Sequence, residues 1–146
     1  MIRMRTRLAQ CIGGPGTLVT AAAVLWFGVA VSAQWGSGWT IPPDAPKEMS
    51  PVKPDADVLA AGKTIFDGNC ARCHGPKGMG DGPDSDPRNP AADLSDPYRA
   101  DLNPDGVMYY RVLNGKPPYM PAFKDELSSD EVWTVVEFAK SLRAPQ

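Results

Sequence analysis

Apolar residues recur at helical spacing in three stretches of the chain, and the first of these leads into a cluster of Cys and His. It begins near Asp57, a residue type common at helix N-caps. Leu59, Gly62 and Phe66 then follow at intervals that place them on one helical face, with Cys70 one turn further on. Gly62 inside this helix costs about 1 kcal/mol relative to Ala, which a close helix crossing would explain.

The other two helices have clear start and stop signals. Asn103 as N-cap and Pro104 at the first helical position predict a helix that ends at Asn-Gly, residues 114–115. Ser128 and Glu131 form a capping box at the start of the last helix. Its apolar face comprises Val132, Val135, Val136, Ala139 and Leu142.

Two stretches lack periodicity, and no segment has the pattern of a β-strand. Residues 34–56 are rich in proline and are predicted to form an extended arm or linker. Residues 75–101 contain many Gly, Pro, Asp and Asn residues and few apolar ones. A structureless loop of this length is uncommon in a small domain, so we expect it to wrap a large group that completes the core.

The first 33 residues have the pattern of an export signal. Three arginines near the start precede an apolar run from Leu18 to Ala33, which ends in the small residues Val31-Ser32-Ala33. The sequence therefore predicts a signal peptide at residues 1–33, an arm at 34–56 and one domain at 57–146. The alternative for residues 1–33 is an uncleaved membrane anchor.

Charge excludes one class of partner. The chain has 15 Lys and Arg against 17 Asp and Glu. Cleavage after Ala33 removes three arginines and leaves 12 basic residues against 17 acidic ones, a net charge of −5. A nucleic-acid-binding protein needs a basic face, so we expect no nucleic-acid partner and consider a basic protein partner more compatible.

The segment Cys70-Ala-Arg-Cys73-His74 contains the only histidine of the chain and both cysteines that follow residue 33. An iron–sulfur cluster usually takes four cysteines, and a structural zinc site needs a fourth ligand that no further Cys or His supplies. A thioredoxin-like redox motif expects a βαβ context, which this sequence lacks. Cys-x-x-Cys-His is also the attachment signal for a c-type haem, in which each sulfur joins one vinyl group and the histidine binds the iron.

A haem iron held by His74 needs a sixth ligand, and methionine is the natural candidate because no second histidine exists. Met49 lies in the arm, Met79 follows the motif closely, and Met108 lies inside a predicted helix. Met120 lies in a loop stiffened by flanking prolines and is far enough along the chain to reach the other side of a haem. We therefore predict His74 and Met120 as the iron ligands.

Three segments together resemble a small single-haem class I cytochrome c. They are FDGNCARCHGPKGMGDGP, YMPAF and LSSDEVWTVVEFAKSLR, and the resemblance covers about residues 57–143. It implies an all-α fold of three to four helices with long loops wrapped around one covalently attached haem. It also implies that the first helix crosses the last one, with Gly62 and Phe66 meeting Val135 and Phe138.

Further residues are expected around the haem. In this family the carbonyl of a proline after the motif often accepts the proximal histidine Nδ1–H, and Pro83 is the candidate here, with Pro87 and Pro90 as rivals. The residues expected to pack against the haem are Leu94, Leu102, Tyr109, Val112, Leu113 and Phe123.

The predicted function is that of a periplasmic one-electron carrier rather than an enzyme. It would pass electrons from a donor dehydrogenase or reductase to an acceptor such as a terminal oxidase, as a monomer. One alternative is a dedicated haem c subunit of a larger redox complex. A haem enzyme or gas sensor with a displaceable Met ligand is a second alternative, and a zinc or thiol redox module is a third. A membrane is expected as a partner only if residues 1–33 stay attached.

Overall fold

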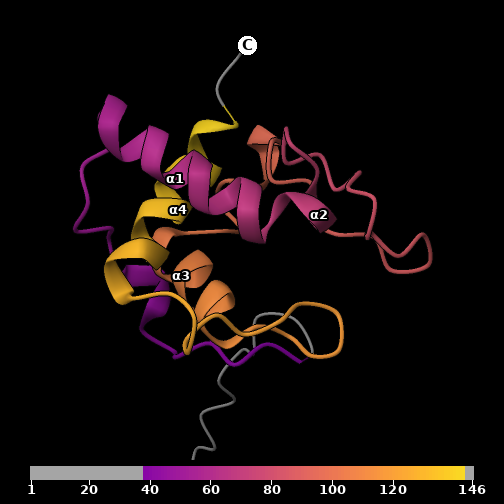
Figure 1. Cartoon of the computed structure of the whole chain (residues 1–146). Coiled ribbons are helices and arrows are strands. Elements are labelled where there is room, and N and C mark those ends of the chain that lie inside the picture. The colour runs from indigo at the N-terminus through magenta and orange to yellow at the C-terminus, as the bar shows by residue number, and fades with distance from the viewer. Residues whose placement is uncertain (1–37, 144–146) are drawn as a thin grey trace, which may run out of the picture. The chain divides into compact units, whose positions relative to one another are not determined.

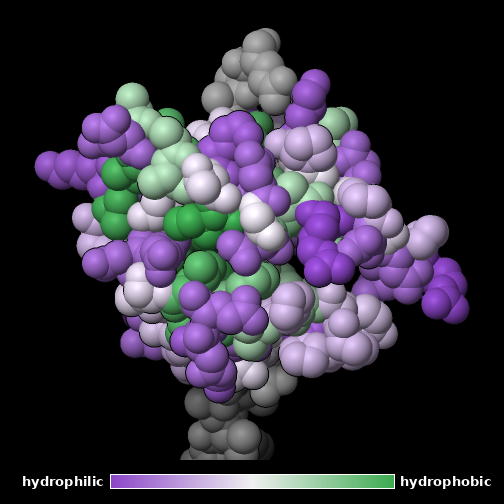
Figure 2. All heavy atoms as spheres, in the orientation of Figure 1, coloured by the Kyte–Doolittle hydropathy of each residue, from purple (hydrophilic) through white to green (hydrophobic). Residues whose placement is uncertain are grey.

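The apolar face of the last helix lies at the centre of the fold. In the computed structural model, which describes residues 38–143, helix α4 (Ser129–Ser141) packs across helix α1 (Ala56–Asn69). Val132 and Val136 of α4 and Phe66 of α1 are almost completely buried. Figure 1 shows α1 crossing α4, and Figure 2 shows hydrophobic residues gathered over the same region. The predicted signal peptide, residues 1–33, lies outside the described residues.

Gly62 permits the close crossing of α1 and α4, as predicted. A Cβ atom at this position would lie 2.6 Å from the carbonyl oxygen of Thr134 and 2.7 Å from Cβ of Phe138. One turn later, the ring centroids of Phe66 and Phe138 are 5.3 Å apart, and Val135 belongs to the same buried cluster. The predicted contacts between the first and last helices are therefore confirmed.

The helix ends follow local capping chemistry, with two corrections. The capping box of Ser128 and Glu131 is present. Helix α1 is capped by Asp55 rather than Asp57, because the Asp55 carboxylate accepts the Val58 N–H at 2.8 Å. Helix α3 (Asp105–Asn114) ends at Gly115 as predicted.

The start of α3 also differs from the prediction. Its N-cap is Pro104 rather than Asn103. The Asn103 side chain donates to the Arg99 carbonyl at 2.7 Å and accepts from Arg111, so it is not available to cap the helix. The prediction placed this helix one residue too early because a side chain that can cap can equally serve a neighbouring loop.

The rest of the described chain is mostly loop. Helix α2 (Ala71–His74) is a single turn, and a 3-10 helix η2 (Pro97–Arg99) interrupts the long segment before α3. Within residues 38–143, extended pairing is limited to two isolated bridges, Asp86 with Asn89 and Lys116 with Met120. None of the helices in this range has the length and apolar character that crossing a bilayer requires. The structure is all-α, as predicted.

The described part of the proline-rich arm packs along α3 (Figure 1). Ala45, in the 3-10 helix η1 (Ala45–Lys47), is completely buried, and a Cβ atom on Gly106 would lie 2.2 Å from its carbonyl oxygen. Further along α3, Tyr110 Oη donates to the Glu48 carboxylate at 3.2 Å, and Asn114 Nδ2 donates to the Thr40 carbonyl at 3.0 Å. The arm therefore covers the helix over its whole length.

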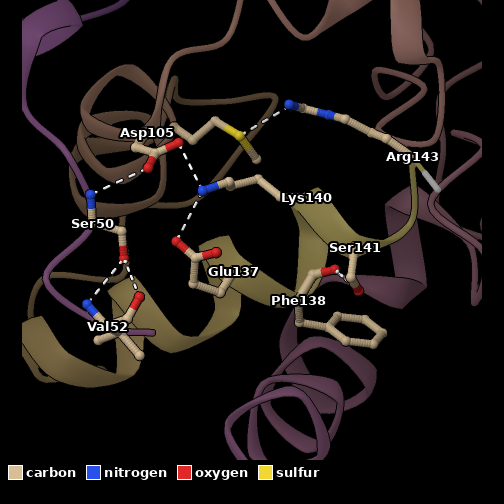
Figure 3. A network of polar contacts seen from close by, with 9 residues as sticks. Ser50, Val52, Asp105, Glu137, Phe138, Lys140, Ser141 and Arg143 are labelled. Atoms are coloured by element: carbon tan, nitrogen blue, oxygen red, sulfur yellow. Dashed lines mark hydrogen bonds and ion pairs between the residues drawn. The ribbon is translucent and has the colours of Figure 1, made fainter. Parts of the chain in front are cut away.

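A cluster of charged side chains joins the arm, α3 and α4 (Figure 3). Lys140 Nζ lies 2.9 Å from Asp105 Oδ1 and 2.9 Å from Glu137 Oε1, and Asp105 also accepts the Ser50 N–H at 3.2 Å. Burial disfavours the charged ammonium, but hydrogen bonds and charge from both carboxylates outweigh it and raise the pKa of Lys140. The buried Glu137 is thus paired, which removes the penalty of burying a lone charge.

Candidate cofactor site

A cavity of about 830 Å³ lies among α1, α2, α3, α4 and the loops that connect them. This volume is within the range of about 300–1,000 Å³ that is usual for cofactor sites. Its wall includes both motif cysteines, His74 and Met120. The structure therefore brings the four predicted attachment and ligand residues to one cavity.

The helical turn α2 presents the Cys-x-x-Cys-His motif to the cavity. The backbone N–H groups of Cys73 and His74 both donate to the Cys70 carbonyl, at 3.1 and 2.9 Å. Burial, reinforced by the neighbouring Cys73, raises the pKa of the Cys70 thiol to about 12, so this thiol is protonated at neutral pH. Both cysteines are free, which leaves their sulfurs available for covalent attachment.

His74 has the orientation and protonation state of a metal ligand. Its Nδ1 lies 3.0 Å from the Ala92 carbonyl oxygen, which can only accept, so Nδ1 carries the proton. Burial lowers the pKa of His74, although the bond to Ala92 opposes this effect. The neutral ring therefore keeps a lone pair on Nε2, the atom that would bind iron.

The prediction that Pro83 accepts the His74 Nδ1–H is wrong, because the acceptor is the Ala92 carbonyl oxygen. The same hydrogen bond excludes the alternative acceptors Pro87 and Pro90. The loop after the motif folds back on it: Gly80 N–H donates to the His74 carbonyl at 2.8 Å and Gly82 N–H to that of Cys73 at 3.1 Å. This tight return leaves Pro83 exposed and outside the cavity wall.

Ala91 and Ala92 then bring the chain past the His74 ring. Gly80 lies so close to these residues that a Cβ atom on Gly80 would be 2.3 Å from the Ala91 carbonyl oxygen. Contact between Gly80 and Ala91 thus sets the position of the next carbonyl, that of Ala92.

Met120 lies on the cavity wall, in the loop between α3 and α4. Two backbone hydrogen bonds with Lys116, of 2.8 and 3.1 Å, close the turn that carries it. Met49 and Met79 are mostly exposed and do not line the cavity. Met108 does line it, but its sulfur already accepts a hydrogen bond from Arg143 Nη2 at 3.1 Å. Met120 thus has the best placed thioether among the described methionines.

Four of the six predicted packing residues line the cavity, and of the three on α3 only the one on its cavity side does so. Leu94, Leu102, Val112 and Phe123 line the cavity, whereas Tyr109 and Leu113 do not. Met108, Arg111 and Val112 occupy the cavity side of α3, and the helical period turns Tyr109 away from it. Tyr109 instead stacks on Trp133, with ring centroids 4.3 Å apart, and its hydroxyl hydrogen-bonds with Ser129 Oγ at 3.1 Å. The predictions for Tyr109 and Leu113 are therefore wrong.

Two arginines on the cavity wall had no predicted role there. The buried Nε atoms of Arg111 and Arg143 lack a hydrogen-bond partner within the described residues. Burial lowers the pKa of both guanidinium groups, and for Arg143 the charge of Asp105 opposes this effect. Buried donors are nearly always satisfied, so these atoms indicate an acceptor inside the cavity.

A c-type haem fits these residues. Its vinyl groups match two free cysteines, its iron matches an imidazole and a thioether, and its carboxylates match unsatisfied arginines. Of the two arginines, Arg111 could have been found from the sequence by its helical spacing, three positions after Met108 and next to Val112.

Comparisons with known proteins agree with this assignment. A protein-family model described as cytochrome c oxidase, cbb3-type, subunit III matches residues 57–138. Cytochrome c6 from Chlorolobion braunii is 35% identical over 80 residues, which cover 55% of this chain and 85% of that protein.

Two solved structures are also similar. A chain of the reducing HAO-like protein complex of Kuenenia stuttgartiensis has 31% identity and a TM-score of 0.52 over 63% of this chain, which spans slightly less than half, 46%, of that chain. Cytochrome cL from Methylophaga aminisulfidivorans has 24% identity and a TM-score of 0.48, covering 60% of this chain and 56% of that one.

Proposed function

Because this chain belongs to the cytochrome c family represented by subunit III of cbb3-type cytochrome c oxidase, we propose that it carries single electrons between redox proteins in the periplasm. Members of this family hold a covalently bound haem c. Haem iron supplies the one-electron chemistry, by alternating between the ferric and ferrous states.

Each functional side chain has a role in this proposal. The sulfurs of Cys70 and Cys73 hold the haem through thioether bonds, and His74 Nε2 and Met120 Sδ bind the iron. The Ala92 carbonyl keeps the His74 ring in one orientation and raises its basicity through the hydrogen bond from Nδ1. Leu94, Val112 and Phe123 exclude water from the same cavity.

One observation carries the proposal: a single cavity wall contains both the Cys-x-x-Cys-His motif and Met120. An iron with two protein ligands has no open position for oxygen, peroxide or substrate, so its natural task is electron transfer rather than catalysis. A methionine ligand also raises the reduction potential.

The donor is proposed to be a dehydrogenase or reductase, and the acceptor an oxidising partner such as a terminal oxidase. The export-signal pattern of residues 1–33 supports a periplasmic location.

A second candidate is a dedicated haem c subunit of a larger complex. It is favoured by the similarity to a chain whose structure is described as a protein complex. Size-exclusion chromatography of the natively purified protein separates the two, since a free carrier elutes as a monomer and a subunit elutes with its partners.

The test of the proposal is an absorption spectrum of the mature protein made in a host that attaches haem c. The expected result is a haem that survives denaturing extraction, shows a methionine–iron charge-transfer band when oxidised, and does not react with carbon monoxide when reduced. Covalent haem that binds carbon monoxide and lacks this band would favour a haem enzyme or gas sensor. A colourless protein would reject the haem assignment.

A further inference from the structure

The N-terminal arm reaches the cavity through one aromatic residue. Trp39 lines the cavity, although it lies outside residues 57–138, the range matched by the family. It is held there by its neighbours: Asn114 donates to the Thr40 carbonyl, and the Lys116 side chain lies against Gly38, within 3.0 Å of where a Cβ would be. The position of Trp39 is thus fixed by contacts with the end of α3 and the loop that follows.

Trp39 covers the guanidinium group of Arg111. The Arg111 Cζ atom lies 5.3 Å from the centroid of the Trp39 ring, within the range of a cation–π interaction. The side-chain oxygen of Asn103 accepts one hydrogen bond from Nη1. Nε is buried without a partner. The guanidinium is therefore held on one face by an aromatic ring and on one edge by an amide, and it keeps a free donor beside the cavity.

We propose that the arm is part of the haem site, where Trp39 positions Arg111 so that its free Nε–H binds a carboxylate of the haem. This inference rests on the proposed function, because the haem supplies the carboxylate. Trp39 acts through Arg111 and is a positioning residue. It also excludes water from the carboxylate, which strengthens the pairing because charges attract more strongly where the dielectric constant is low.

The reduction potential reports on this arrangement. Ferric haem has one more positive charge than ferrous haem, so water and an unpaired carboxylate both favour the ferric state. Opening the Trp39 cover therefore lowers the potential. It also raises the pKa of the haem carboxyl group toward the ordinary range of carboxylic acids, about 4, because the pairing with Arg111 weakens.

Other charged groups face the same cavity. The segment before α3 contributes Asp84, Asp86, Asp93 and Arg99. Arg72 lies on α2, Lys116 in the loop after α3, and Arg143 two residues beyond the end of α4. From the arm, Glu48 hydrogen-bonds Tyr110 on the neighbouring turn of α3. A hydrogen bond from Ser95 lowers the pKa of Asp93. These groups remain in all the variants below, so their titration contributes equally to each.

The experiment measures the midpoint potential of the haem-loaded protein between pH 3.5 and 8 for four variants. Trp39→Leu removes the ring, Trp39→Phe keeps an aromatic face, and Asn114→Ala loosens the arm without touching the cavity wall. Trp133→Phe is the control, because Trp133 is a buried tryptophan that packs on Tyr109 and does not line the cavity.

The expected result is a lower potential for Trp39→Leu, with a pH-dependent step at a higher pH than in the native protein. Asn114→Ala shifts the potential and the pH of the step in the same directions by smaller amounts. Trp39→Phe keeps most of the native potential and pH profile. Trp133→Phe lowers thermal stability and leaves the potential unchanged. A native potential and pH profile in both Trp39→Leu and Asn114→Ala would overturn the inference.

Failure of this inference is distinguishable from failure of the proposed function. Each variant is first examined for covalent haem and for the methionine–iron band. If both are present and the potential does not respond to Trp39, only the role of the arm is rejected. If the native protein lacks covalent haem, the proposed function is rejected, and with it the carboxylate that Arg111 would bind.

Discussion

Met120 and Met79 have the same thioether group in different surroundings. Met120 lies on the cavity wall, whereas the side chain of Met79 is mostly exposed and outside it. We expect Met120→Ala to abolish the methionine–iron band, lower the reduction potential and let the ferrous protein bind carbon monoxide. Met79→Ala, the matched control, should change none of the three. A band that survives in Met120→Ala would assign the sixth ligand to another residue, and Met108 would then be examined first.

For single residues, the sequence predicts those whose chemistry depends on their immediate neighbours in the chain. It misses those whose position depends on contacts with distant parts of the chain. Cys70, Cys73 and His74 were predictable because their spacing alone suits a porphyrin. The Ala92 carbonyl was not, because a backbone oxygen has no side-chain signature, and its position depends on the contact between Gly80 and Ala91. The role of Arg111 depends on Trp39, more than seventy residues earlier, which no local pattern indicates.

Helix α1 offers two glycines with opposite environments. A Cβ atom at Gly62 would collide with Thr134 and Phe138 of α4, whereas a Cβ atom at Gly68 meets nothing within 4 Å. We expect Gly62→Ala to destabilise the protein by about 1–3 kcal/mol, as overpacking does. Gly68→Ala should stabilise it by about 0.5–1 kcal/mol, because alanine loses less backbone entropy in a helix.

Denaturant unfolding of the haem-loaded proteins, followed by circular dichroism, measures both effects. Equal stability changes for the two glycine variants would contradict the close crossing of α1 and α4. A loss in Gly62→Ala with unchanged haem absorption would show that the crossing stabilises the fold without setting the iron ligands.

The capping box of α4 predicts a pH-dependent contribution to stability. Hydrogen bonds from the backbone and hydroxyl of Ser128 lower the pKa of Glu131 in the folded protein. A carboxylate with a lowered folded-state pKa stabilises the fold above its unfolded pKa, and this contribution is lost as the pH falls through the folded-state value. Glu131→Gln should therefore be less stable than the native protein at pH 7, and the difference should disappear in acid.

Thermal unfolding between pH 2 and 7 measures the effect. Glu126→Gln, which removes an exposed negative charge just before α4, is the control for the change in net charge alone. If the Glu131→Gln difference persisted unchanged in acid, its cause would be lost packing rather than lost charge.

Elements were predictable from the sequence where their ends are capped locally, as with Ser128 and Gly115. The path of the arm was not. Residues 38–52 have no periodicity, and their position depends on Ala45 meeting Gly106, a contact between two small residues about sixty positions apart. A glycine at the start of α3 thus permits a close approach that only the folded chain reveals.

The charge of the whole molecule is unevenly distributed along the chain. Residues 34–146 contain 12 basic and 17 acidic residues. Residues 81–101 alone contain six aspartates and two arginines. The loop that projects from the body in Figure 1 lies in this range and is mainly hydrophilic in Figure 2. The cavity wall differs, since its arginines and lysine outnumber its aspartates. The haem carboxylates offset this excess, so the acidic net charge of the molecule should dominate its long-range attraction for a redox partner, and the wall should contribute only at short range.

Ionic strength decides which of the two dominates. At about 0.01 M salt the screening length is roughly 30 Å, so a small reagent responds to the net charge of the whole protein. We expect a cationic cobalt complex to oxidise the ferrous protein faster as salt is lowered, by roughly tenfold or more, and hexacyanoferrate(III) to show the opposite slope. At about 0.15 M the length falls to about 8 Å, and the local wall acts alone. Stopped-flow oxidation across this salt range measures both slopes. If hexacyanoferrate(III) instead oxidised the protein faster as salt was lowered, the cavity wall rather than the net charge would steer association, and an acidic partner would then be the better fit.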